Sequence, residues 1–142
     1  MAQQPVNVTA STFTVTRNAH AGAVVTLNRA AGIAVTLPAA SGYGDVYTFY
    51  CGTTVTSNST TIKVASSSDV MKGLALVAAD GGNSVNGWES AADTDTITWD
   101  GTTTGGVAGD LVELIDVASG VWLVRVTGSA TGTEATSFSA TV

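Results

Sequence analysis

The sequence predicts an all-β, single-domain protein, either a β-sandwich of jelly-roll-like form or a small barrel. Its 142 residues fit one domain that can bury a core without disulfides. Thr, Val, Ala, Ser and Gly make up most of the chain, and β-branched residues favour strands. Short alternating segments are separated by frequent turn signals, which is typical of sandwiches and barrels. No repeat of 20–50 residues stands out, so we expect neither a solenoid nor a propeller.

Alternating or aromatic segments predict four strands in the first part of the chain, at residues 11–17, 23–27, 32–37 and 46–51. In the first, Phe13 and Val15 share one face, which indicates a half-buried strand. A turn is expected at 18–22, and Pro38 ends the third strand because it has no N–H to donate. The fourth strand is partly apolar on both faces, so we expect it in the centre of a sheet.

Five further strands are predicted at residues 60–65, 74–77, 95–99, 110–117 and 121–127. A helical turn is expected at Val70–Met71, capped by the Ser66–Asp69 segment. The turn-rich segment 80–87 is expected to be an exposed loop with Trp88 at its end. The last two strands flank Ala118-Ser119-Gly120, and this spacing predicts a hairpin with a turn and a bulge.

The predicted domain organisation is an N-terminal arm at 1–11, a β domain at 12–128, and a C-terminal tail or last strand at 129–142. The arm is either a frayed end or a segment that orders by adding a strand to a partner's edge. Residues 1–12 contain neither a basic segment nor an apolar one, so we expect no signal peptide.

Charged residues make up only 11% of the chain, and the net charge is −6. Intrinsic disorder is excluded because it needs low hydrophobicity together with high net charge. The five cations are scattered, so no basic patch is available and we expect no nucleic-acid partner. No apolar run approaches the roughly 20 residues of a membrane helix, so we expect no membrane partner either.

The chain offers little catalytic chemistry, with one histidine, His20, and one cysteine, Cys51. His20 lies in a predicted turn, and Cys51 is expected to be a small buried hydrophobic residue. We therefore expect no catalytic residues, no cofactor and no enzyme activity. Asp93, Asp95 and Asp100 lie close together, but their spacing matches no calcium loop. We expect no metal site there, although the sequence leaves open whether this cluster binds an ion.

Large aromatic residues provide the candidate anchors. Tyr47, Phe49, Trp99 and Trp122 lie on predicted strands and are expected to anchor either the core or contacts between subunits. Trp88 follows a polar loop, where it either contacts a partner or folds back onto the core of its own chain.

Three blocks occur in order over roughly residues 26–124: NRAAGIAVTLPAASGYGDVYTF at 28–49, NSTTIKVA and DVMKG within 58–73, and GDLVELIDVASGVWLV at 109–124. Together these blocks resemble capsid decoration proteins of tailed bacteriophages, also called cement or head-stabilising proteins. Similar runs occur in phage tail-fibre and spike domains. Cys51 departs from the pattern, which has an aliphatic residue there.

The resemblance implies a trimer on the outer surface of the phage head, made in the cytoplasm of the host bacterium. Its partners would be copies of itself and the major capsid protein. The shell-contact candidates are Gln3, Gln4, Pro5 and Val6 in the arm, together with Trp88. The alternative is a tail-fibre or spike module that recognises a glycan of the host surface, with Trp88, Tyr43 and the aspartate cluster lining the site.

Overall fold

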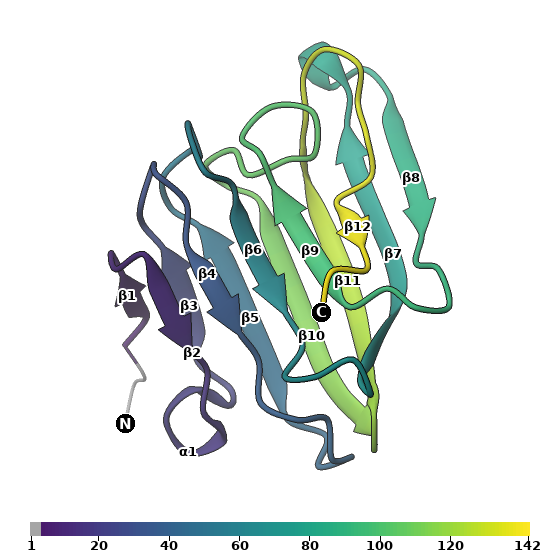
Figure 1. Ribbon diagram of the computed structural model, residues 1–142. Helices are drawn as coiled ribbons and strands as arrows, with labels where there is room; N and C mark the ends of the chain where they lie inside the picture. Colours follow the sequence, from purple (N-terminus) through teal and green to yellow (C-terminus); the bar gives the residue numbers. More distant parts are fainter. Residues whose placement is uncertain (1–3) are drawn as a thin grey trace.

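Two β-sheets pack face to face in the computed structural model, which describes residues 4–142 (Figure 1). The larger sheet has seven strands in the order β1-β3-β5-β10-β11-β7-β8. The smaller sheet has five strands in the order β12-β9-β6-β4-β2. The prediction of an all-β fold is confirmed, and the two layers form a sandwich because each sheet buries one apolar face against the other.

The bounds of the elements place most strands within the predicted segments. The larger sheet contains β1 (Val6–Val8), β3 (Val24–Leu27), β5 (Val46–Cys51), β10 (Leu111–Ala118), β11 (Val121–Ser129), β7 (Val70–Ala78) and β8 (Val85–Glu89). The smaller sheet contains β12 (Phe138–Ser139), β9 (Thr96–Trp99), β6 (Thr60–Lys63), β4 (Ala34–Thr36) and β2 (Thr12–Thr14). The described residues also form one turn of α-helix, α1 (Arg17–His20), and a 3₁₀ turn at Asp80–Gly82. Neither helical segment in this part of the chain is long or apolar enough to cross a membrane.

The first six strands wind back and forth between the two sheets. β1, β3 and β5 pair in parallel in the larger sheet, while β2, β4 and β6 pair in parallel in the smaller one. This winding resembles a short solenoid, which the sequence did not predict because the turns share no repeated motif. The predicted hairpin of β10 and β11 is confirmed, including an irregularity between Asp116 and Ala118.

The core lies between the sheets and contains all four predicted aromatic anchors. Tyr47, Phe49, Trp99 and Trp122 are each at most 2% exposed. The rings of Tyr47 and Trp122 meet edge to face with their centroids 5.6 Å apart. These residues are anchors of the core of a single chain. A role in packing between subunits is wrong for them, because none of the four reaches the surface.

Two local predictions are wrong in the region of β7 and β8. Val70–Met71 begins β7 and forms no helical turn, because β7 pairs with β11 along nine residues and this pairing outweighs the capping signal. The predicted loop at 80–87 contains the start of β8, so Trp88 lies on a strand. The Gly- and Asn-rich composition hid this strand, which forms because β7 offers it a partner. Near the N-terminus, the turn expected at 18–22 overlaps α1.

The described segments near both ends of the chain contribute strands to the sandwich. Residues 1–3, including the candidate Gln3, lie outside the described residues. Val6–Val8 forms β1 beside β3, so the segment predicted as an arm at 1–11 contains a strand of the larger sheet, and the candidate Val6 is part of it. At the other end, β12 pairs with β9 and Phe138 is buried, which favours a last strand over a free tail.

Gly101→Ala tests the tight turn after β9. A Cβ there would lie 1.7 Å from the Val55 carbonyl oxygen, and the residue has a φ of +86°. We expect a loss of about 3–5 kcal/mol in the free energy of unfolding, measured by urea denaturation. Gly22→Ala is the control, because its φ is +76° but no atom lies within 4 Å of the added Cβ. It should lose only about 1–2 kcal/mol, and equal losses would show that the contact with Val55 is unimportant.

Candidate functional site

The outer face of the larger sheet carries most of the exposed apolar side chains in the described part of the chain. Eight large hydrophobic side chains are exposed in the described part of the chain, and six of them belong to strands of the larger sheet. Alternation along the paired strands puts them on the side facing away from the smaller sheet. They are Val24, Tyr50, Leu74, Leu76, Val85 and Val117. Isolated exposed hydrophobic residues are common, but a concentration on one face indicates an interaction surface.

The most exposed apolar side chains of this outer face concentrate toward its two ends, with Val117 on β10 between them. The β7–β8 patch consists of Leu74, Leu76 and Val85, and the β3–β5 patch consists of Val24 and Tyr50. Between them, on β10 and β11, Glu113 and Arg125 are cross-strand partners with a carboxylate–guanidinium distance of 3.5 Å. This pair is exposed to solvent, so it adds little stability. It lies between the two patches, next to the half-buried apolar pair of Ile115 and Leu123.

A groove of about 290 Å³ lies between β7 and β11, beside the β7–β8 patch. Leu74 and Leu76 line one side, and Leu123 and Thr127 line the other. β7 and β11 approach closely at Gly73, where a Cβ would lie 1.8 Å from the Val124 carbonyl oxygen. The groove is therefore a shallow apolar channel above two tightly paired strands.

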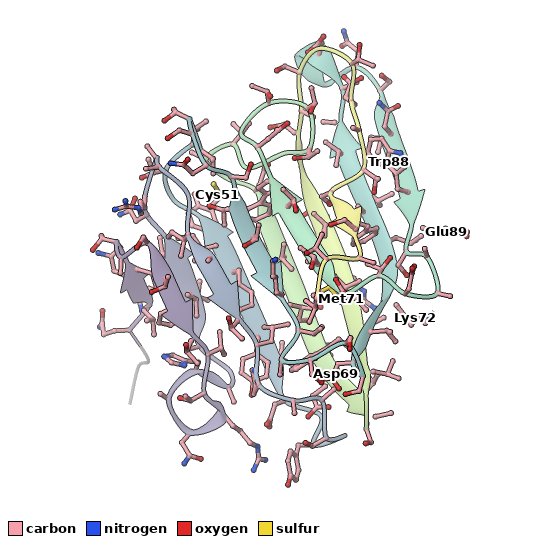
Figure 2. The ribbon with its side chains drawn as sticks, viewed as in Figure 1. Cys51, Asp69, Met71, Lys72, Trp88 and Glu89 are labelled. Carbon is pink, nitrogen blue, oxygen red and sulfur yellow. The ribbon has the colours of Figure 1, made fainter. Side chains whose placement is uncertain are left out.

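The free edge of β8 borders this patch (Figures 1 and 2). The Ala79 N–H donates to the Ser84 carbonyl at 2.9 Å, and the Ser90 N–H donates to the Gly73 carbonyl at 3.0 Å. Because such bonds recur at every second residue of an antiparallel strand, Val85, Gly87 and Glu89 direct their backbone polar groups away from β7.

β8 is also the least protected sheet edge among the described strands. β1 and β2 have three residues each and β12 has two, whereas β8 has five and contains neither Pro nor Lys. Sheet edges are usually shortened or charged to prevent unwanted pairing. Trp88 lies on this edge strand and is half-buried (Figure 2). Trp88 is the cross-strand partner of the buried Ala75, so its side chain lies on the inner face of the sheet, opposite Val85 and the groove.

The outer face of the smaller sheet has a different composition. Threonines occupy most of its outward positions, and the described strands of this sheet carry no large exposed hydrophobic side chain. The outward residues are Thr12, Thr14, Ala34, Thr36, Thr61, Lys63 and Thr98. The two outer faces of the sandwich thus differ, since one exposes aliphatic carbon and the other mainly hydroxyl groups.

His20 and Cys51 have structural surroundings. The His20 Nδ1 atom accepts a hydrogen bond from the Thr16 N–H at 2.9 Å, and its ring packs edge-on against Phe13. Cys51 is buried, as the sequence predicted. Burial, together with the nearby charge of Asp110, raises the pKa of the Cys51 thiol to about 11. The thiol therefore remains protonated at neutral pH and is a poor nucleophile.

Two of the three clustered aspartates, Asp95 and Asp100, have separate structural roles. Asp95 accepts hydrogen bonds from the backbone N–H groups of Thr141 and Val142, at 2.8 and 3.2 Å. Asp100 instead accepts from the residues of its own turn, including the Thr102 N–H at 2.8 Å. Across residues 4–142, no three His, Cys, Asp or Glu side chains are grouped so that they could hold a metal ion.

The residues expected to line a glycan site are also apart. Tyr43 precedes β5, whereas Trp88 lies on β8, and three strands separate β5 from β8 in the sheet. Asp95 is buried and bonded to Thr141 and Val142 at the end of the chain. The structure therefore does not assemble these residues into one site.

The outer face of the larger sheet is not among the sequence predictions, because the two apolar sides of 46–51 indicate only a central strand and the other strands are interpreted with one buried side. The signal is nevertheless present in the strand sequences. The segments at 74–77 and 111–115 have apolar residues at both odd and even positions, as 46–51 does. A strand with two apolar sides in a two-layer protein leaves one of them for a partner.

Asp95→Asn should lower the free energy of unfolding by about 1–3 kcal/mol at neutral pH. Burial alone would raise the pKa of Asp95, but hydrogen bonds from Thr141, Thr96 and Val142 outweigh burial and hold this pKa below its ordinary value. The carboxylate therefore stabilises the fold fully above the ordinary pKa, and this contribution disappears as the pH falls through the lowered one.

Urea denaturation at neutral and at acidic pH checks this expectation. The difference between wild type and Asp95→Asn should be present at neutral pH and shrink in acid. The exposed neighbour Asp93 provides the control, because Asp93→Asn should change stability by less than about 0.5 kcal/mol. A neutral-pH stability of Asp95→Asn equal to that of wild type would contradict the role assigned to this carboxylate.

The comparisons with known proteins add no assignment. No family model, curated protein or solved structure matches the chain. The candidate site is therefore defined by its own geometry: an apolar outer face, the groove within it and the free edge of β8.

Proposed function

We propose that the protein is a structural virion component, a decoration protein that binds the outside of an assembled phage capsid and stabilises it as a trimer. The observation that carries this proposal is the difference between the two outer faces of the sandwich. A protein that covers a surface needs one side to bury in contacts and another that water solvates. The three sequence blocks that resemble decoration proteins support the placement on a phage head.

The outer face of the larger sheet supplies most of the area that one stable contact needs. Seven strands spaced about 4.8 Å apart give a width of about 29 Å. With strand lengths averaging about 20 Å, the flat area is about 600 Å², before the relief of the side chains is counted. Stable protein interfaces bury about 800 Å² per partner. The occupant we propose for this face is a second copy of the chain.

The two apolar ends of the face fit the symmetry of a trimer. A closed three-fold ring needs a heterologous contact, in which two different patches of each copy meet. In our proposal, the β7–β8 patch of one copy packs against the β3–β5 patch of the next. The open edge of β8 then lies inside the contact, where its backbone groups find partners. The threonine-covered face of the smaller sheet remains in water.

Capsid stabilisation follows from binding linkage. A protein that binds only the assembled shell favours assembly over disassembly, and three linked copies bind more tightly than one. Gln4 and Pro5 are exposed just before β1, and they remain our candidates for contact with the major capsid protein. Low charge suits a surface that becomes buried, while the net charge of −6 keeps the free protein soluble.

Leu74→Glu combined with Leu76→Glu should convert the trimer to a monomer, because two charges would enter the apolar patch. Light scattering after size exclusion, at micromolar concentration, measures the mass. Thr12→Glu combined with Thr14→Glu adds the same charge to the smaller sheet and should leave the trimer intact. A monomeric wild-type protein would overturn the trimer, and an unaffected leucine variant would overturn the contact.

Binding to heads tests the proposed function itself. Purified protein should bind native heads stripped of it and raise the temperature at which they release DNA. The double leucine variant should bind heads more weakly than the double threonine variant, because it has lost avidity. Binding to host cells without binding to heads would overturn the decoration function and favour the tail-fibre or spike alternative.

A further inference from the structure

A polar hollow of about 300 Å³ opens on the outer side of the smaller sheet. It lies where the parallel strands β2, β4 and β6 begin, between the loops that lead into them. Its polar lining comes from Ser11, Arg29, Asn58, Ser59 and Thr61. Ala34 and Thr61 connect it to the threonine-covered face. No acidic side chain lines this hollow.

Arg29 is the charged group of the hollow, and its hydrogen-bonding capacity is mostly unused. Its Nη1 atom donates to the Thr9 carbonyl at 3.4 Å, while its buried Nε atom has no partner among the described residues. The described part of the chain places no carboxylate within 4.0 Å of it. Arg17 and Arg125, in contrast, each pair with an acid. A guanidinium has five N–H donors, and its geometry matches a carboxylate or a phosphate.

The neutral side chains around Arg29 are also available to a ligand. Within the described residues, the side chains of Ser11, Asn58, Ser59 and Thr61 take part in none of the hydrogen bonds of the fold. Three hydroxyl groups and one amide therefore line the same hollow as a single guanidinium. This set can donate several hydrogen bonds to one group of oxygen atoms.

The loop that supplies two of these groups is held in an unfavourable backbone conformation. Asn58 and Ser59 have φ values of 56° and 44°, and they are the non-glycine residues with positive φ in the described chain. Gly32 allows this arrangement, because a Cβ there would lie 2.2 Å from the Ser59 carbonyl oxygen. Such strained positions cluster at binding sites, where the surrounding structure fixes them.

We propose that this hollow binds one oxyanion, a carboxylate or phosphate, with the Arg29 guanidinium as its charged partner and the surrounding hydroxyl and amide groups as further donors. An acidic sugar and a free small anion share this chemistry. The site goes beyond the proposed capsid function, because it lies on the face that the trimer leaves in water. Its failure would leave that function untouched.

Titration of the full-length ¹⁵N-labelled protein tests the proposal by NMR. The probes are sodium phosphate, sodium glucuronate and neutral glucose, at an ionic strength held constant with sodium chloride. Phosphate or glucuronate should cause saturable shifts concentrated at residues 31–34 and 58–61, and glucose should not. The absence of saturation with both anions would overturn the proposal, as would an equal response to glucose. Glucuronate binding without phosphate binding would point to an acidic sugar as the source.

Variants assign the binding to Arg29. Arg29→Met should weaken anion binding at least tenfold. Arg29→Lys should weaken binding less, because lysine keeps the positive charge but loses the paired N–H donors of the guanidinium. Arg125→Met removes the same charge elsewhere and should have no effect. Equal losses in Arg29→Met and Arg125→Met would reduce the effect to net charge and overturn the site. Asn58→Gly provides a second test, because glycine keeps the positive φ of this position while the side-chain amide is removed. This variant should weaken binding severalfold.

Discussion

The two-residue period of the strands is the constraint on which the rest of the structure depends. Because alternate side chains point to opposite sides, every strand contributes one row to a single apolar layer. Phe49 from β5, Ile62 from β6 and Trp122 from β11 meet in that layer although they come from distant parts of the chain. The same period forces the remaining side chains outward, where they define two surfaces of different chemistry.

Buried carboxylates hold the loops onto this layer. Asp116 accepts hydrogen bonds from the backbone N–H groups of Ser41 and Gly42, at 2.9 and 2.6 Å. Asp110 accepts from Gly106, Val107 and Ser129, although burial still raises the pKa of its carboxyl. Backbone donors of irregular loops need such acceptors when water is excluded. Several of the few acidic residues therefore have structural roles.

The two outer faces of the sandwich are suited to two different kinds of contact. Aliphatic carbon on β7 and β8 suits burial against another protein, where little charge has to be desolvated. The threonine-covered face suits water, and the hollow around Arg29 adds to it a site for a small charged group. The two proposals thus occupy opposite sides of one sandwich. Each can be tested without disturbing the other, because the core lies between them.

The sequence by itself determined the all-β class, most strand positions, the β10–β11 hairpin and the burial of Cys51, while it left the four aromatic anchors open between the core and subunit contacts. These follow from local alternation, turn residues and hydrophobicity. Only the tertiary structure decided that Val85–Glu89 forms a strand, that the first six strands wind between two sheets, and that the apolar sides of β7 and β8 lack a partner. It also decided that Arg29, Asn58 and Ser11 share one hollow. Such features depend on pairing between segments that are distant in the sequence. The local pattern of one segment does not specify the strand with which it pairs.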